Sequence, residues 1–339
     1  MRITVVGAGA MGASYGGHLA RAGHEVALLD TWQDHVDAIN RDGLRVDGVL
    51  GDHRIKVPAS AAPNGAAAAS GAPGGGADVA IVFVDANNTA KAAETLAGLL
   101  APDGFAITFQ NGIGNVEKLQ AALGPERVLG GSSMCSAASR APGHVTLTHM
   151  GTTSLGETGL GGTQGSDSPR VQAMLDALRG AGFEAEHEPN VMGLIWQKFV
   201  VNCAVNAIAA TTNLRGGEIV RLPELDAFQD RVLDEIMAVT RAKDIRLPNP
   251  AIAAKIKAQC HKKFNKPSML QHVEAGRRTE IEALNGALIR EAQAFGIPTP
   301  NNEALVALLK GRELHQQRRL HQPDLDYDAW EARIAAGKE

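Results

Sequence analysis

In the first half of the chain, short apolar runs typical of strands alternate with segments whose apolar residues follow the period of a helix. Residues 3–6 form a short β-branched run, a helical pattern continues to about residue 22, and a second apolar run covers residues 25–30. A further run at residues 78–84 (DVAIVFV) is almost wholly apolar, as in a strand that is buried on both faces. Strands that alternate with helices predict a parallel sheet with helices packed on its faces.

Weaker patterns follow these runs. The segment at residues 59–76 is almost entirely Ala, Gly, Ser and Pro. It predicts a flexible surface loop, with an Ala-rich helix in its first half as the alternative. Further expected elements are strands at 105–109 and 128–131, a hairpin-like piece at 44–58, and an antiparallel pair near the sheet edge made by 144–148 and 153–156.

The pattern changes at residues 188–190, after which long helical periods continue to about residue 311 with almost no strand signal. We therefore expect two domains, a sheet-containing one at 1–189 and an all-α one at 190–339. A short helix is expected in the polar tail, at residues 327–336.

Composition and charge exclude several classes of function. The 33 Lys and Arg against 37 Asp and Glu give a net charge of −4, which offers no basic surface for nucleic acid. The three cysteines lie far apart, and the first residues lack the pattern of a secretory signal, so a reducing, cytoplasmic location is expected. The 11 histidines show no ligand spacing, and no metal site is predicted.

Residues 191–210 form an apolar stretch long enough to cross a membrane. Lys198, Asn202 and Asn206 lie in its middle, and such groups are expensive in hydrocarbon. The stretch therefore predicts a buried core helix, with no membrane association.

Gly7, Gly9 and Gly12 form G-x-G-x-x-G between the first strand and the first helix. In such a loop the first glycine makes the turn, the second lets a pyrophosphate approach the backbone, and the third lets helix and strand pack closely. The helix amino terminus then offers N–H groups to the anion. The pattern favours a Rossmann-type, doubly wound α/β domain that binds a dinucleotide through Gly7, Ala8, Gly9, Ala10, Met11 and Gly12. A glycine-rich turn retained only for packing is the alternative.

Asp30 ends the second strand, 18 residues after Gly12. A carboxylate there can accept hydrogen bonds from the ribose hydroxyls of NAD and repels the 2′-phosphate of NADP. Thr31 follows, where a phosphate site would favour Arg. Asp30 therefore favours NAD(H); a turn or helix-capping role is the alternative.

Lys198, Asn202 and Asn206 are spaced by four residues, so they share one face of a helix. A lysine among apolar neighbours loses solvation, which makes it a candidate proton donor. The asparagines can donate hydrogen bonds to a ligand in the same place. A snorkelling lysine with two satisfied core amides explains the pattern equally well.

The segment at residues 266–296 carries an apolar helical stripe that begins at Glu280. Ser268 lies 12 residues earlier, about 18 Å along a straight helix, so the two residues can share one site only if the helix breaks, for example at Gly276. Ser268 with Gln271 also fits a capping box.

Four stretches resemble the ketopantoate reductase (2-dehydropantoate 2-reductase) family along nearly the whole chain. The glycine motif is shared with many dehydrogenases, whereas the last two stretches are more specific. They are VVGAGAMG at 5–12, FQNGIGN at 109–115, KFVVNCAVNA at 198–207, and SMLQHVEAGRRTEIEALNGALIREAQAFGIPTPNN at 268–302. The resemblance implies an oxidoreductase of pantothenate biosynthesis or a related reaction, with a small 2-keto or 2-hydroxy acid substrate in a cleft between two domains. A homodimer is expected on the same basis alone.

The resemblance also implies roles for particular residues. The family's lysine at the position of Lys198 is the general acid, and its glutamate at Glu280 supports that lysine and the substrate. The asparagine matching Asn111 lies beside nicotinamide and substrate. Substrate hydroxyl and carboxylate groups are bound at the positions of Asn202, Asn206 and Ser268.

Two departures from the family bear on the cofactor. Many members hold the NADP phosphate with an arginine after the second strand and with the lysine of a V-K-A segment. This chain has Asp30-Thr31 at the first place and Asp85 at the second, so acids replace both cations and NAD(H) is favoured.

Two other functions remain open. A 3-hydroxyacid dehydrogenase of the 3-hydroxyisobutyrate type also combines a Rossmann domain with a K-x-x-x-N helix, and the segment from Ser268 to Glu280 argues against it. A non-catalytic NAD(P)-binding sensor would bind NADH and reduce no keto acid, and the set of Lys198, Asn202, Asn206 and Glu280 argues against it.

Overall fold

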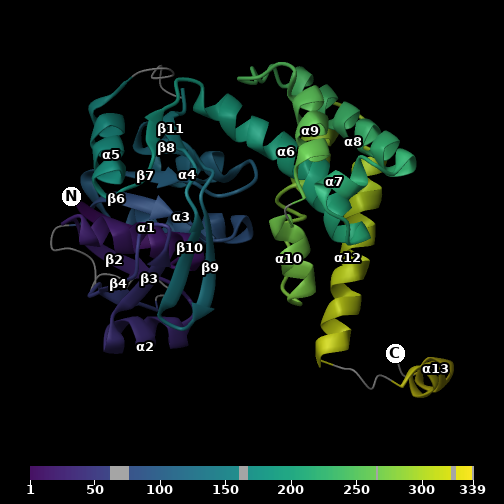
Figure 1. Ribbon diagram of the computed structural model, residues 1–339, viewed down its shortest axis with the longest axis horizontal. Helices are drawn as coiled ribbons and strands as arrows, with labels where there is room; N and C mark the ends of the chain where they lie inside the picture. The colour runs from purple at the N-terminus through teal and green to yellow at the C-terminus, as the bar shows by residue number, and fades with distance from the viewer. Residues whose placement is uncertain (62–75, 160–166, 265, 322–325, 338–339) are drawn as a thin grey trace. The chain divides into compact units, whose positions relative to one another are not determined.

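The computed structural model describes residues 1–61, 76–159, 167–264, 266–321 and 326–337 (Figure 1). The predicted loop at 59–76 therefore lies mostly outside the described residues, and its first two residues form strand β5 (Ala59–Ser60).

The chain falls into two compact units. The first comprises Met1–Phe199 with Asp244–Pro250, and the second comprises Val200–Lys243 with Ala251–Glu339. This division passes through the long helix α6 (Val191–Thr212), whereas the boundary expected from the sequence precedes that helix.

The first unit is built on an eight-stranded sheet with the order β12-β11-β8-β7-β6-β1-β2-β5. All neighbouring strands are parallel except β8 and β11. The strand order reverses at β1, which has β2 on one side and β6 on the other, so the predicted doubly wound α/β class is confirmed. The strands are β1 (Arg2–Val6), β2 (Glu25–Leu29), β5 (Ala59–Ser60), β6 (Ala77–Val82), β7 (Leu100–Thr108), β8 (Val128–Ser133), β11 (Thr153–Glu157) and β12 (Ala185–His187).

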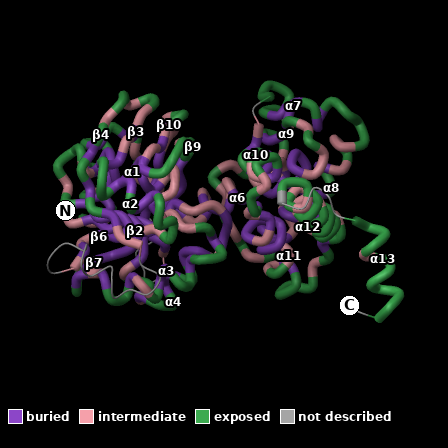
Figure 2. Tube along the Cα trace, turned by 90° about the horizontal axis from the view of Figure 1, so that it is seen from below, coloured by how far each residue is buried: buried purple, intermediate pink, exposed green. Residues whose placement is uncertain are grey.

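Helices of the first unit bury this sheet. Strands β1, β2 and β6 are buried along most of their length, as expected for a sheet covered on both faces (Figure 2). Helix α1 packs against strands of this sheet and also against a second, smaller sheet, which explains why eight of its 12 residues are buried. The helices are α1 (Ala10–Arg21), α2 (Gln33–Asp42), α3 (Thr89–Ala97), α4 (Asn115–Leu123) and α5 (Pro169–Gly180), followed by α6.

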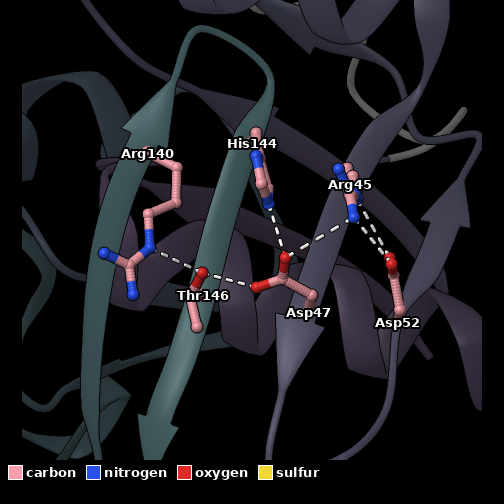
Figure 3. A network of polar contacts seen from close by, with 6 residues as sticks. All are labelled: Arg45, Asp47, Asp52, Arg140, His144 and Thr146. Atoms are coloured by element: carbon pink, nitrogen blue, oxygen red, sulfur yellow. Dashed lines mark hydrogen bonds and ion pairs between the residues drawn. The ribbon is translucent and has the colours of Figure 1, made fainter.

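The smaller sheet has four strands in the order β4-β3-β10-β9, with bounds β3 (Leu44–Gly48), β4 (His53–Ile55), β9 (Ser136–Ala141) and β10 (His144–His149). Its outer face carries charges (Figure 3). The carboxylate of Asp47 accepts hydrogen bonds from Thr146 and from His144 Nε2, the latter at 2.7 Å, and Arg45 pairs with Asp52 at 2.7 Å. These hydrogen bonds lower the pKa of Asp47. A face that carries these charges is solvated, so only the opposite face of the smaller sheet is buried.

The predicted antiparallel pair of residues 144–148 with 153–156 is wrong. Strand β10 pairs with β9 and β3 in the small sheet, whereas β11 pairs with β8 and β12 in the large one. The physical reason lies in their burial. Every residue of β11 is buried, which requires cover on both faces, whereas β10 alternates between buried and accessible positions until its exposed end.

The described residues of the second unit form helices, as predicted for an all-α region. A polar cluster joins four of them. Asn285 Nδ2 donates to the Cys203 carbonyl of α6 at 3.2 Å and to Asn302 Oδ1 at 2.8 Å. Glu235 accepts the backbone N–H groups of Asn301 and Asn302. The helices are α7 (Gly216–Ile219), α8 (Pro223–Ala242), α9 (Ile252–Lys262), α10 (Ser268–Glu274), α11 (Asn285–Ala294), α12 (Pro300–His321) and α13 (Tyr327–Ala335). The short helix predicted in the tail is therefore confirmed.

Among the described residues, α6 alone has the length and hydropathy of a membrane-spanning helix, and 61% of its most apolar window is buried inside the protein. Burial of this extent is what the sequence predicted for a core helix.

Candidate active site

Several predicted site residues lie at one edge of the large sheet. Strands β2, β1, β6, β7 and β8 are parallel neighbours, so their carboxyl ends meet at the same edge. Asp30 follows β2, the glycine loop follows β1, Asn111 lies beyond the end of β7, and Ser133 ends β8. The strand order reverses between β1 and β6, and such a switch point is where open α/β sheets bind ligands.

The three glycines of the loop differ in what surrounds them. Gly7 has φ +91°, and a Cβ on it would lie 2.6 Å from Val84 N. A Cβ on Gly12 would lie 1.9 Å from the carbonyl oxygen of Gly7. A Cβ on Gly9 would meet no described atom within 4 Å. The packing of the protein therefore requires glycine at two positions and leaves the space beside the third open.

Gly9 is also the N-cap residue of α1, and no side chain of the described chain caps this helix. The first turn contains no acidic residue. Its N–H groups and the positive end of the helix dipole therefore remain available to an anion beside the loop.

Asp30 makes one of the contacts expected of a turn residue: its Oδ1 accepts the backbone N–H of Trp32 at 2.9 Å. The hydrogen bond orients the carboxylate at the end of β2, next to the strand that carries the glycine loop. The turn role that the sequence left as an alternative is thus present, and it occupies only one of the two carboxylate oxygens.

His35 was missed by the sequence analysis. It is fully buried on α2, where its ring stacks on Trp32 with centroids 5.0 Å apart. Burial lowers the pKa of His35, so the neutral ring donates from Nε2 to the Ala8 carbonyl at 3.0 Å and accepts the Gly143 N–H at Nδ1. Through its hydrogen bond to the Ala8 carbonyl, His35 therefore holds the glycine loop in place. A lone histidine in a polar helix gives no sequence signal for this role.

Asn111 lies in a bend between β7 and α4 that neighbouring amides hold in place. Asn115 Nδ2 donates to the Asn111 carbonyl at 3.0 Å, and Gln110 Nε2 donates to the Val84 carbonyl at 2.6 Å. The second bond ties the bend to the chain that follows β6. Both amides belong to the FQNGIGN stretch, in which the sequence predicts a role for Asn111 alone. A small pocket here is lined by Thr108, Gln110, residues 112–117, Gly131, Met192, Ile195 and Trp196.

Lys198 is half-buried on α6, and its Nζ donates to the carbonyl oxygen of Ser133 at 2.7 Å. Because Ser133 ends β8, this bond holds the ammonium at the same edge of the sheet as the glycine loop, within the first unit. A snorkelling lysine keeps its ammonium in water. The Lys198 ammonium instead donates to a backbone carbonyl at the end of a strand.

The remaining predicted residues belong to the second unit. Asn202 and Asn206 are half-buried and follow Lys198 along α6 at the predicted spacing. Ser268 is exposed as the first residue of α10, and Glu280 is half-buried in the segment between α10 and α11.

Two expectations for this segment need correction. Residues 281–284, predicted as helix, form turns, and α11 begins only at Asn285. The break falls at Gly276, with φ +65°, as the sequence suggested, so the straight-helix separation of Ser268 from Glu280 does not apply. The described residues Ser268 and Gln271 do not form the expected capping box, because Pro267 is the N-cap of α10 and Gln271 Nε2 donates to the Lys266 carbonyl.

Comparisons with known proteins agree with this architecture. The family model for ketopantoate reductase PanE/ApbA matches residues 3–159, and the model for its C-terminal part matches residues 190–313. The chain is 33% identical over 312 residues to a 2-dehydropantoate 2-reductase of Archaeoglobus fulgidus, covering 92% of this chain and 98% of the relative. It is 30% identical to that of Halobacterium salinarum, covering 91% and 98%.

Solved structures are similar over nearly the whole chain. A PanE/ApbA family ketopantoate reductase from Ralstonia eutropha JMP134 matches with a TM-score of 0.82 and 33% identity, covering 94% of this chain and all of that one. A D-mandelate dehydrogenase in ternary complex with NADH and anilino(oxo)acetate matches with a TM-score of 0.81 and 25% identity, covering 93% and 99%.

Proposed function

Because the chain belongs to the ketopantoate reductase family of NAD(P)-dependent keto acid reductases, we propose that it interconverts a 2-keto acid and the corresponding 2-hydroxy acid. The substrate proposed is 2-dehydropantoate or a related branched acid. The observation that carries the proposal is the bond from Lys198 Nζ to the Ser133 carbonyl, which holds the ammonium at the edge of the sheet that carries the glycine loop.

The residues of the loop fit a dinucleotide. Gly9 leaves open the space through which a pyrophosphate approaches the backbone, and the first turn of α1 offers N–H groups there. The segment from Gly7 to Gly12 would hold the pyrophosphate, Asp30 the adenosine ribose, and Asn111 the nicotinamide end. When bound, the nicotinamide supplies or accepts a hydride at C4.

Lys198 is the proposed general acid. Its ammonium gives a proton to the keto oxygen as the carbonyl carbon is reduced, and the neutral amine takes the proton back in the reverse direction. Glu280 is proposed to orient Lys198 and share its charge. Asn202, Asn206 and Ser268 are proposed to bind the hydroxyl and carboxylate groups of the acid.

We propose NAD(H) as the preferred cofactor. Asp30 is held at the end of β2 by the Trp32 amide, and Asp85 is exposed just beyond β6. Both carboxylates would repel a 2′-phosphate at this edge. We also propose a cytoplasmic location, on the basis of the composition, and a homodimeric state, on the basis of the family resemblance alone.

A substrate panel tests this function. We expect purified enzyme to reduce 2-keto acids with branched or aromatic side chains, 2-dehydropantoate and phenylglyoxylate included, faster with NADH than with NADPH. The structural similarity to a D-mandelate dehydrogenase is the reason to include the aromatic acid. Activity confined to 3-hydroxy acids would instead identify a 3-hydroxyisobutyrate-type enzyme, and NADH binding without any turnover would identify a sensor.

Exchanging the acid at the end of β2 should change the cofactor preference. We expect Asp30→Ser combined with Thr31→Arg to raise kcat/KM for NADPH relative to NADH by about 10–100-fold, since it removes a repulsive carboxylate and adds a guanidinium for the phosphate. Initial rates with both cofactors measure the ratio. Asp34→Ala is the matched control, because Asp34 is an exposed acid in the first turn of α2, and it should leave the ratio unchanged. An unaltered ratio in the double variant would remove Asp30 from the cofactor site.

A further inference from the structure

Tyr15 places a phenolic hydroxyl in the core of the first unit, on the helix that begins at the glycine loop. It is fully buried three residues after Gly12. Its hydroxyl lies 2.8 Å from Ser133 Oγ and 2.5 Å from Thr153 Oγ1. Ser133 and Thr153 face each other in the antiparallel register of β8 and β11, so the hydroxyl bridges two strands where one of them ends.

The same serine holds the proposed proton donor. Ser133 Oγ also accepts the backbone N–H of Cys135 at 3.1 Å, so its side chain has two partners. Its carbonyl oxygen accepts the hydrogen bond from Lys198 Nζ at 2.7 Å. A continuous series of contacts thus runs from α1 through the side chain and the carbonyl of Ser133 to the ammonium.

Packing alone does not explain a tyrosine at this place. Three phenylalanines surround its ring, with centroid separations of 4.2 Å to Phe183, 5.0 Å to Phe83 and 5.8 Å to Phe109. A phenylalanine would fill the same space and would avoid the cost of burying a hydroxyl. Burial raises the pKa of Tyr15, so its hydroxyl stays protonated and remains a donor.

We propose that Tyr15 is a positioning residue for Lys198, acting through Ser133. Its hydroxyl fixes the Ser133 side chain and thereby the peptide group whose carbonyl holds the ammonium. The proposal rests on the proposed function, in which Lys198 protonates the substrate. The proposal also links the cofactor loop to Lys198, because helix α1 begins at that loop and carries the tyrosine that fixes Ser133.

Kinetics of Tyr15→Phe test the proposal. The variant keeps the ring and removes only the hydroxyl. We expect kcat for keto acid reduction to fall about tenfold, since small displacements of a catalytic group lower the rate strongly, while KM for NADH and for the keto acid changes less than about twofold. Ser133→Ala is the second variant, should the first fold poorly. It keeps the carbonyl, loses the same hydrogen bond, and should lower kcat to a similar extent.

A double-mutant cycle separates positioning from a general structural effect. In a Lys198→Ala background, Tyr15→Phe should lower the residual rate no further, because its effect passes through the ammonium. Thr240→Val is the matched control: it removes a buried hydroxyl bonded to the Ile236 carbonyl in the second unit and should leave kcat unchanged.

The outcomes are distinct. A normal kcat in Tyr15→Phe and Ser133→Ala, with turnover lost in Lys198→Ala, would overturn the positioning role and leave the proposed function intact. Multiplicative rate losses in the double variant would overturn it as well, since they indicate an independent effect. Full turnover in Lys198→Ala would overturn the positioning role together with the proposed role of Lys198 as general acid, and the keto acid reductase activity itself would stand.

Discussion

Replacing Lys198 with alanine is expected to lower kcat by about 10²–10⁴-fold, the contribution typical of a positioned general acid. The variant loses the ammonium that Ser133 holds at the edge of the sheet. It leaves the glycine loop and α1 untouched, so the Kd for NADH should stay within about twofold. The expected loss therefore lies in kcat, and cofactor binding should be preserved.

Steady-state rates with NADH and a saturating keto acid measure the first quantity, and NADH fluorescence titration measures the second. Lys257→Ala provides the control, because Lys257 is also half-buried on a helix but forms ion pairs with Asp226 and Asp230. It should alter stability and leave kcat close to the wild-type value. Undiminished turnover in Lys198→Ala would exclude this lysine as the proton donor.

Alanine at Gly9 and at Gly12 should weaken cofactor binding for different reasons. A methyl group at Gly9 meets no described atom within 4 Å, so Gly9→Ala should fold normally. The same methyl group would occupy the approach of the pyrophosphate and should weaken NADH binding by at least about tenfold. At Gly12 the methyl carbon would lie 1.9 Å from the Gly7 carbonyl, so Gly12→Ala should be destabilised by about 3 kcal/mol or more and should lose cofactor binding through the distorted loop.

Thermal unfolding and NADH titration of the two variants separate these effects. Alanine is the better helix former by about 1 kcal/mol, so any loss of stability at Gly12 must come from the close contact. Gly180→Ala, at the end of α5 with nothing within 4 Å of an added Cβ, is the control and should lower neither stability nor NADH affinity. Wild-type affinity for NADH in Gly9→Ala would show that the loop is not the pyrophosphate site.

Local pattern was sufficient for most elements of the first unit. The runs at residues 3–6, 25–30 and 78–84 correspond to β1, β2 and β6, because a strand covered on both faces needs a continuous apolar run. The glycine motif gave the strand-loop-helix order directly. The close contact at Gly12 is with Gly7 of the same loop and Gly9 borders open space, whereas the close contact at Gly7 is with Val84, which is distant in the chain.

Pairing and interruption of elements were less predictable. The segments that became β10 and β11 are close in sequence, yet they joined different sheets because one is covered on a single face and the other on both. The periodicity after Glu280 predicted helix too early, because its apolar side chains serve a packed turn as well as they serve a helix.

The chain alone predicts the doubly wound sheet, the glycine loop, the helical second half and the face shared by Lys198, Asn202 and Asn206, because each leaves a local pattern of apolar runs, glycine spacing or helical period. Three contacts could be found only in the folded protein: the Ser133 carbonyl holds Lys198, His35 donates to Ala8, and Tyr15 reaches Ser133. These partners are 65, 27 and 118 residues apart. A hydrogen bond across such a separation leaves no periodicity in the chain, because it depends on which strands and helices the fold brings side by side.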